Sequence, residues 1–376
     1  MSLRLRLIPC LIALMVSPSA LAQPHNIALN AENLDLSGAR DVRFETLAGR
    51  DAMCFSGVAL INDQAGGQGR LRADIYNSRA RQFANLVFHA SDGDNNEDVY
   101  LRIHKSGLED SVQYTPQIKG ESHWQLFPNH QAQINFGQAD WIGFEVEFNE
   151  RQARASVHTD HGVEHLDIAE LILRGDGEGL GLRSLFGACF SNVSFDPSPV
   201  VLNNISAEPI ERAGLITQWG LSNAHPFTGF EAVSATSWDQ VESEANGTVL
   251  ISRYRAKAQG GNFEANGVDV VTAGVIVTSE SDQTVRLNFD VSDMARIALN
   301  GQDLVELNNS FRAKNAQTLF RGDFDINTQT LFLPLRAGEN VLTFTVADRA
   351  NGWGLAARLD PDADVKVRPY LPNQTD

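Results

Sequence analysis

Polar and aromatic side chains recur at alternate positions between residues 85 and 104, where a strand pattern is clear. Val99, Leu101 and Ile103 point to one face of the predicted strand 99–104, and the polar residues between them point to the other. Amide, imidazole and guanidinium groups can hydrogen-bond the hydroxyls of a polar ring, and aromatic planes can stack on its C–H face. We therefore expect a ligand-binding face that contains Asn85, His89, Tyr100, Arg102 and His104.

A long loop is predicted directly after this strand. About twenty residues without regular structure are uncommon in a compact domain unless they serve a function. The segment carries Asp110, Gln113, Tyr114, His123 and Trp124. We expect it to fold over the polar face and to add Gln113, Tyr114 and Trp124 to the ligand-binding residues.

Paired carboxylates offer a second kind of chemistry. Glu145 and Glu147 share one strand face, and retaining glycosidases use two carboxyl groups about 5 Å apart. The next acid, Glu150, falls in the turn of a predicted hairpin at residues 149–152 and leaves the strand. We therefore favour a surface hairpin over an active site, and we assign no catalytic residue.

Two segments resemble metal sites only superficially. The acidic run 92–98 has the alternating oxygens of a calcium loop, but it lacks the glycine and the final glutamate that such a loop needs. His158, His161 and His165 have no helix to present them together to zinc. We therefore expect no metal and no cofactor.

The first 22 residues have the pattern of a signal peptide. Arg4 and Arg6 precede the apolar run 7–16, and the small residues 20–22 follow it. The run is too short to span a bilayer, so we expect an exported chain, periplasmic or extracellular, without membrane insertion. A formal net charge of −17 argues against nucleic acid as a partner.

Two cysteines, Cys54 and Cys189, remain after the signal peptide. In an exported protein such a pair favours a disulfide, although two separate buried thiols are the alternative.

Alternating segments bounded by Gly, Asn and Asp recur throughout, with almost no helical periodicity, which predicts an all-β protein. A Pro- and Asn-rich stretch divides the chain. We expect two tandem β-sandwich (jelly-roll) domains at 23–196 and 210–361, joined by a linker at 197–209 and followed by a flexible tail at 362–376.

The first half resembles the concanavalin A-like lectin/glucanase superfamily in its laminin-G-like form. The resemblance covers roughly residues 40–196 and rests on Gln113-Tyr114-Thr115-Pro116, His123-Trp124-Gln125-Leu126, the hairpin 141–157 and the closing strands 179–193. In such jelly rolls the first and last strands lie side by side, which would bring Cys54 and Cys189 together.

The second half resembles a galactose-binding-like jelly roll over roughly residues 210–360. The matching segments are 289–293, 297–301, 333–340 and Gly352-Trp353-Gly354. Each superfamily hosts many roles, so these resemblances predict a fold more sharply than a function.

The sequence thus predicts an exported, non-catalytic protein that binds carbohydrate on the polar face of its first sandwich. A glycoside-processing enzyme of the concanavalin A-like class and a surface adhesion or protein-interaction module are the two alternatives.

Overall fold

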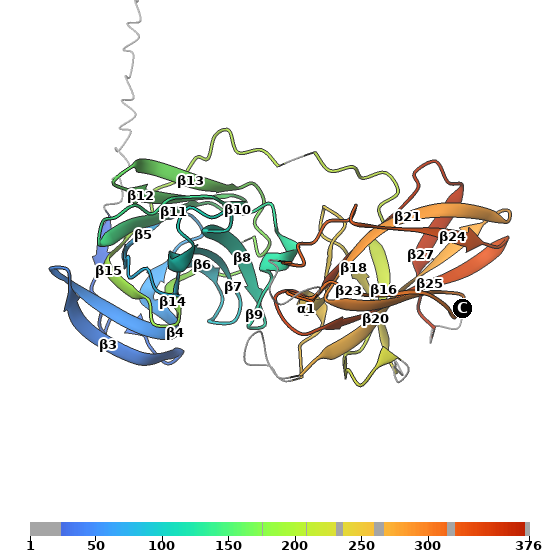
Figure 1. Ribbon diagram of the computed structural model, residues 1–376, viewed down its shortest axis with the longest axis horizontal. Coiled ribbons are helices and arrows are strands. Elements are labelled where there is room, and N and C mark those ends of the chain that lie inside the picture. The colour runs from blue at the N-terminus through green and yellow to red at the C-terminus, as the bar shows by residue number, and fades with distance from the viewer. Residues whose placement is uncertain are drawn as a thin grey trace, which may run out of the picture.

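The computed structural model describes residues 24–174, 176–207, 209–230, 236–258, 267–313 and 320–372. They form two lobes side by side, the first lobe up to residue 207 and the second lobe from residue 209 (Figure 1). The described chain is nearly all β: its helical elements are α1 (Ile251–Tyr254) and the 3-10 turns η1 (Ile103–Lys105) and η2 (Trp124–Leu126). No described helix is long and apolar enough to cross a membrane. The predicted signal peptide lies outside the described residues.

One antiparallel sheet folds around the core of the first lobe. Its main path runs β10-β8-β7-β6-β14-β4-β15-β5-β11-β12-β13. The strands of this lobe are β1 (His25–Ile27), β2 (Leu34–Asp35), β3 (Ala39–Leu47), β4 (Arg50–Ala65), β5 (Gly69–Tyr76), β6 (Phe83–Ala90), β7 (Asn96–Arg102), β8 (Val112–Ile118), β9 (Glu121–Ser122), β10 (Gln131–Ala132), β11 (Trp141–Phe148), β12 (Ala153–Thr159), β13 (Gly162–Ile168), β14 (Gly179–Leu185) and β15 (Cys189–Asp196).

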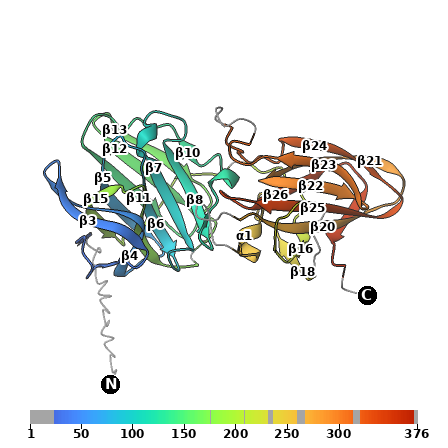
Figure 2. The same ribbon diagram turned by 60° about the horizontal axis from the view of Figure 1, so that its bottom comes forward.

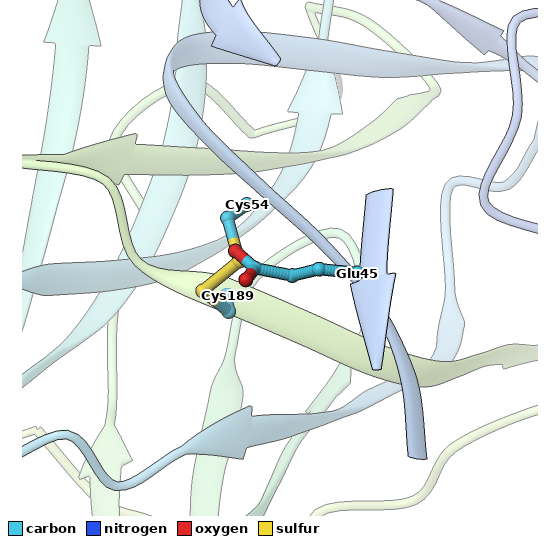
Figure 3. A group of neighbouring side chains, drawn as sticks. All are labelled: Glu45, Cys54 and Cys189. Atoms are coloured by element: carbon cyan, nitrogen blue, oxygen red, sulfur yellow. A yellow bond between two sulfur atoms is a disulfide. The ribbon is translucent and has the colours of Figure 1, made fainter. Parts of the chain in front are cut away.

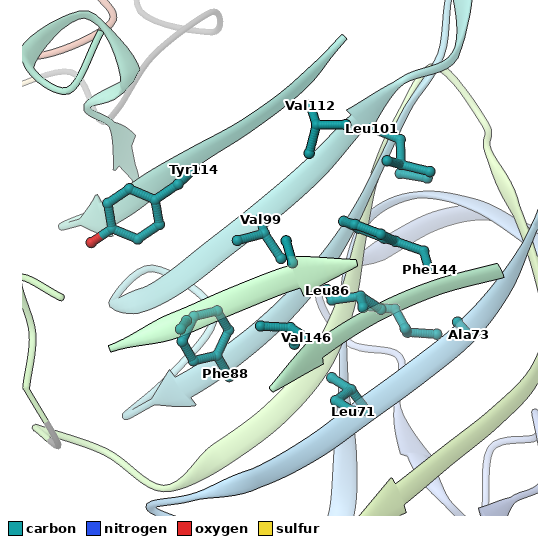
Figure 4. Packing of buried hydrophobic residues seen from close by; sticks show 14 of the residues in the cluster. Leu71, Ala73, Leu86, Phe88, Val99, Leu101, Val112, Tyr114, Phe144 and Val146 are labelled. Atoms are coloured by element: carbon teal, nitrogen blue, oxygen red, sulfur yellow. The ribbon is translucent and has the colours of Figure 1, made fainter. Parts of the chain in front are cut away.

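The core of the first lobe lies between two layers of this sheet. Alternate residues of β5 and β11, such as Leu71 and Phe144, face alternate residues of β6 and β7, such as Leu86 and Val99 (Figure 4). These side chains are fully buried, as their period of two predicts. The arrangement is the one expected of a β-sandwich.

The predicted disulfide is present. Cys54 on β4 and Cys189 on β15 are direct partners across the two strands, and their sulfur atoms lie 2.02 Å apart. Glu45 of β3 points toward the bridge (Figure 3). Because the two sulfur atoms are bonded to each other, they are not free thiolates that could bind a metal with Glu45.

The second lobe packs two antiparallel sheets around a separate core that includes Trp219, Phe289, Phe344 and Trp353. Its strands are β16 (Gln218–Ser222), β17 (His225–Pro226), β18 (Trp238–Glu242), β19 (Val249–Leu250), β20 (Asp269–Ser279), β21 (Gln283–Ser292), β22 (Met294–Leu299), β23 (Gln302–Asn308), β24 (Gln329–Leu335), β25 (Gly338–Asp348), β26 (Gly354–Leu359) and β27 (Val365–Pro369).

The tail expected to be flexible at 362–376 contains a strand. Residues of β27 pair with β20 from Val365 opposite Ser279 to Pro369 opposite Val275. Most side chains of β27 are exposed, so the sequence of this segment looks polar. Its backbone nevertheless pairs with β20 and adds a strand to the sheet.

The two lobes are packed against each other. Leu250, Phe324 and Ala356 of the second lobe belong to the hydrophobic core of the first. Figure 2 shows β8 and η2 of the first lobe turned toward the second lobe. The segment predicted as a ligand loop therefore lies where the lobes meet.

Candidate functional site

The outward side of β8, β7, β6 and β14 carries a row of polar side chains that we call the front face. The strand register places Gln113 beside Tyr100, Tyr100 beside Asn85, and Asn85 beside Arg183. Three of the predicted ligand residues are thus neighbours on one sheet face, because alternate residues of paired strands point the same way.

The centre of the front face is a buried hydrogen-bonded network. The Tyr100 hydroxyl donates to Gln113 Oε1 at 2.9 Å, and Asn85 Nδ2 donates to Asp98 Oδ1 at 2.6 Å. Asp98 also pairs with Arg183 at 3.0 Å. Burial raises the pKa of Asp98 to about 7, and the charge of Arg183 opposes that rise. These side chains are buried and hydrogen-bond one another. They therefore stabilise the front face from within and are little exposed to solvent.

One end of the front face is open and aromatic. Phe83, His104 and Phe186 form what we call the aromatic rim: the Phe83 ring lies 5.4 Å from His104 and 6.0 Å from Phe186. Arg102 lies over Phe83 and Arg81 over Phe186. Phe186 is 57% exposed. An exposed aromatic flanked by guanidinium groups is a surface on which a flat polar molecule can stack.

A cavity of about 470 Å³ adjoins the rim. Its lining combines a carboxylate, a guanidinium, an amide, a hydroxyl and an aromatic ring, contributed by Asp41, Val42, Arg43, Ser56, Gln82, Phe186 and Gly187. The lining is mostly polar with one aromatic ring, so it offers hydrogen-bonding groups beside a stacking surface.

Four polar atoms of the predicted residues are buried without a hydrogen-bond partner among the described residues. Asn85 Oδ1, Arg102 Nε and His104 Nδ1 lie on the front face or at its aromatic rim, and the fourth atom is His89 Nδ1. Burial, followed by the charge of Arg102, lowers the pKa of His104, so its imidazole is neutral near pH 7 and offers both a donor and an acceptor. Buried polar groups normally have partners, so the front face retains hydrogen-bonding capacity next to the rim.

His89 and Tyr114 do not lie on the front face as predicted. His89 has a φ of 47° and sits beside a register shift in β14, so its ring turns inward and packs edge-on against Phe148 at 5.2 Å. Tyr114 is fully buried in the core, where its hydroxyl donates to Glu97 Oε2 at 2.6 Å.

The predicted loop is largely regular structure. β8 pairs with β7 along its length, so Gln113 and Tyr114 point to opposite faces of a strand. The prediction failed because Gln, Thr and Pro at 113–117 obscure the alternation that reveals a strand.

Trp124 lies in the contact between the lobes and not over the front face. Its Nε1 donates to Asn351 Oδ1 at 3.1 Å, its ring packs edge-on against Phe311, and Arg321 stacks on it at 4.9 Å. Only 9% of the residue is exposed. This environment is that of an interface anchor.

Asp110 joins the front face to the second lobe. It contacts Arg102 and Lys105 of its own lobe, and Arg321 of the second lobe reaches it at 2.5 Å. Burial alone raises the pKa of Asp110, but the three cations outweigh it and lower the pKa below its usual value. The charge is therefore retained and holds Arg102 in position.

The other sequence candidates are engaged elsewhere. Glu145 and Glu147 lie on the outer face of β11, where Arg70 pairs with both and Arg72 approaches Glu145. This paired surface, in the sheet layer opposite the front face, favours the hairpin interpretation over a pair of catalytic carboxylates.

The sequence pattern did not indicate Phe83 and Phe186 as site residues. Phe83 begins β6 directly opposite Arg102, and Phe186 follows β14 in a turn with a φ of 65°. A large apolar residue at an exposed turn is the signal that could have indicated Phe186.

No protein-family model and no curated protein matches this sequence. Among solved structures, a carbohydrate-binding module from Bacillus subtilis is similar at 11% identity and a TM-score of 0.31, covering 47% of this chain and 97% of that one. A xylan β-1,4-xylosidase from Bacillus halodurans is similar at 10% identity and a TM-score of 0.33, covering 44% of this chain and 37% of that one.

An anti-sigma factor domain-containing protein from Clostridium clariflavum is similar over more of the chain, at 10% identity and a TM-score of 0.22, with 87% and 88% of the two chains covered. At TM-scores this low, the likeness carries no argument about this chain, and the proposals below rest on its own residues.

Proposed function

We propose that this chain is an exported, non-catalytic protein that binds carbohydrate at the aromatic rim and the adjoining cavity. The observation that carries the proposal is the exposed Phe186 ring beside Arg81 and above a cavity lined by mixed polar groups. Aromatic rings match the C–H face of a sugar, and the neighbouring guanidinium, amide and imidazole groups match its hydroxyls.

The predicted ligand residues take two different parts in this proposal. Arg102 borders the aromatic rim, His104 is part of it, and both contact the ligand. Asn85, Tyr100 and Gln113 form the buried network behind it and fix the position of Arg102, whose Nη1 donates to Gln113 Oε1 at 3.1 Å. We further propose that the first lobe is laminin-G-like and the second galactose-binding-like, with the second lobe as a supporting module.

The alternative functions have weaker support. An enzyme of the concanavalin A-like class would need two converging carboxyl groups, and Glu145 and Glu147 are paired with arginines. A protein-binding module would need a contiguous apolar patch, whereas Phe186 is surrounded by charged and polar groups.

The test compares two exposed phenylalanines. A glycan array on the exported protein identifies the ligand, and its affinity is then measured for Phe186→Ala and for the matched control Phe332→Ala, which removes a 66% exposed ring from the second lobe. We expect Phe186→Ala to weaken binding about tenfold or more, equivalent to about 1.4 kcal/mol, with the control unchanged. Equal affinity of both variants would contradict the proposal.

A further inference from the structure

A buried cluster of one lysine and two carboxylates lies where the lobes meet, away from the aromatic rim. Lys257 Nζ contacts Asp348 Oδ2, and it lies 2.9 Å from Glu121 Oε1. The three side chains are 4%, 0% and 3% exposed. Lys257 and Asp348 belong to the second lobe, whereas Glu121 comes from β9 of the first.

Lys257 and Asp348 are within salt-bridge distance, but their contact lacks the geometry of a hydrogen bond. Lys257 Nζ and both Asp348 carboxylate oxygens lack a hydrogen-bond partner of acceptable geometry among the described residues. Burying charged groups without such partners is costly, and a buried ion pair rarely repays the cost. An amide that joins the two side chains would carry no charge and would replace the buried ammonium and carboxyl groups.

We infer that Lys257 and Asp348 form an intramolecular isopeptide bond and that Glu121 is the catalytic base. The inference is independent of carbohydrate binding, because none of the three residues borders the aromatic rim.

The protonation states fit this condensation. Burial, followed by the charges of Glu121 and Asp293, raises the pKa of Asp348 well above its usual value and keeps it as a neutral acid. Despite its burial, the pKa of Glu121 is lowered by His123 and Lys257, which keeps it ionised. Burial lowers the pKa of Lys257, but its contacts with Asp348 and Glu121 outweigh burial and keep the lysine charged, so its proton must first pass to Glu121.

The step balances without any further reactant. The Lys257 ammonium gives one proton to the Glu121 carboxylate, and its nitrogen lone pair attacks Cγ of the protonated Asp348. A C–N bond forms, and the C–O bond to the hydroxyl of Asp348 breaks. The hydroxyl leaves as water after taking one proton from the nitrogen, which keeps its last hydrogen as the amide N–H. Glu121 finishes protonated and releases its proton to its surroundings.

The position of Glu121 is held from both lobes. Ser252 Oγ donates to Glu121 Oε2 at 2.8 Å, and His123 Nε2 lies 3.9 Å from the same oxygen. Because the base comes from the first lobe and the reacting pair from the second, the bond can form only after the lobes have docked. Once formed, it would close a long loop of the second lobe covalently.

The experiment is the intact mass of the exported protein after denaturation and reduction of the disulfide. We expect the wild-type mass to be lower than the sequence mass by one water molecule, and a protease digest to yield a branched peptide that joins Lys257 to Asp348. Lys257→Arg, Asp348→Ala and Glu121→Gln should each have the full sequence mass. The control Lys366→Arg, which changes an exposed lysine, should retain the deficit.

A wild-type protein with the full sequence mass would overturn the inference, and this measurement does not depend on whether any variant folds. A water lost elsewhere, or a branch between Lys257 and Glu121, would overturn the assignment of the bonded pair. A complete cross-link in Glu121→Gln would overturn the role of Glu121 as the base.

Discussion

Replacing Trp124 with alanine separates an interface role from a ligand-binding role. The side chain is 9% exposed, and a buried aromatic removes about 150–250 Å² from water. At about 25 cal/mol per Å² this area is worth about 4–6 kcal/mol, and measured truncations of buried aromatics cost about 3–5 kcal/mol. The variant also loses the hydrogen bond to Asn351 and the stacking of Arg321.

We therefore expect Trp124→Ala to lower the free energy of unfolding by about 3–5 kcal/mol. Urea denaturation followed by circular dichroism measures the loss, and hydrogen exchange should increase around Gln125 and Arg321, which meet across the lobes. The control is Trp238→Ala, which removes a half-buried ring from the second lobe and should cost less. Carbohydrate affinity at the rim should change little in molecules that remain folded. Unchanged stability with abolished binding would show that Trp124 is a ligand residue and not an interface anchor.

Two further predictions concern the first lobe. Cys54→Ala should remove the bridge across a sequence separation of 135 and lower stability by up to about 5 kcal/mol, seen as a lower urea midpoint; an unchanged midpoint would contradict a structural role. Burial raises the pKa of Glu97 from 4.5 to about 7, although Tyr114 donates to it. Since the folded state then holds its proton more tightly than the unfolded state, Glu97 contributes stability at low pH that is lost as the pH rises from about 4 to about 7. Glu97→Gln should flatten stability over that window, and a pH profile identical to wild type would show that the carboxyl does not titrate there.

The strands with clean alternation could be predicted from the sequence. Val99 and Leu101 are fully buried, and Arg102 points to the opposite face. Successive side chains of a strand alternate between its two faces, so a shift by one residue changes the face. The disulfide followed from the resemblance to a jelly roll, in which the strands that carry Cys54 and Cys189 are neighbours.

The failures occur where tertiary contacts override local pattern. The residue types around Trp124 occur both in sugar-binding sites and in interfaces. The contacts of Trp124 with Asn351 and Arg321 of the second lobe show that it lies in the interface. His89 keeps the correct strand position but turns inward at a bulge, which no single-sequence pattern reveals. Lys257 is far from Glu121 and Asp348 in sequence, so their cluster appears only after folding.

The most direct test of carbohydrate binding is an NMR titration of the protein with the best glycan from the array. We expect chemical-shift changes concentrated at the aromatic rim and its cavity, in the backbone amides of Gln82, Phe83, His104 and Phe186. Changes confined to the second lobe, or the absence of any saturable change across the array's ligands, would contradict it.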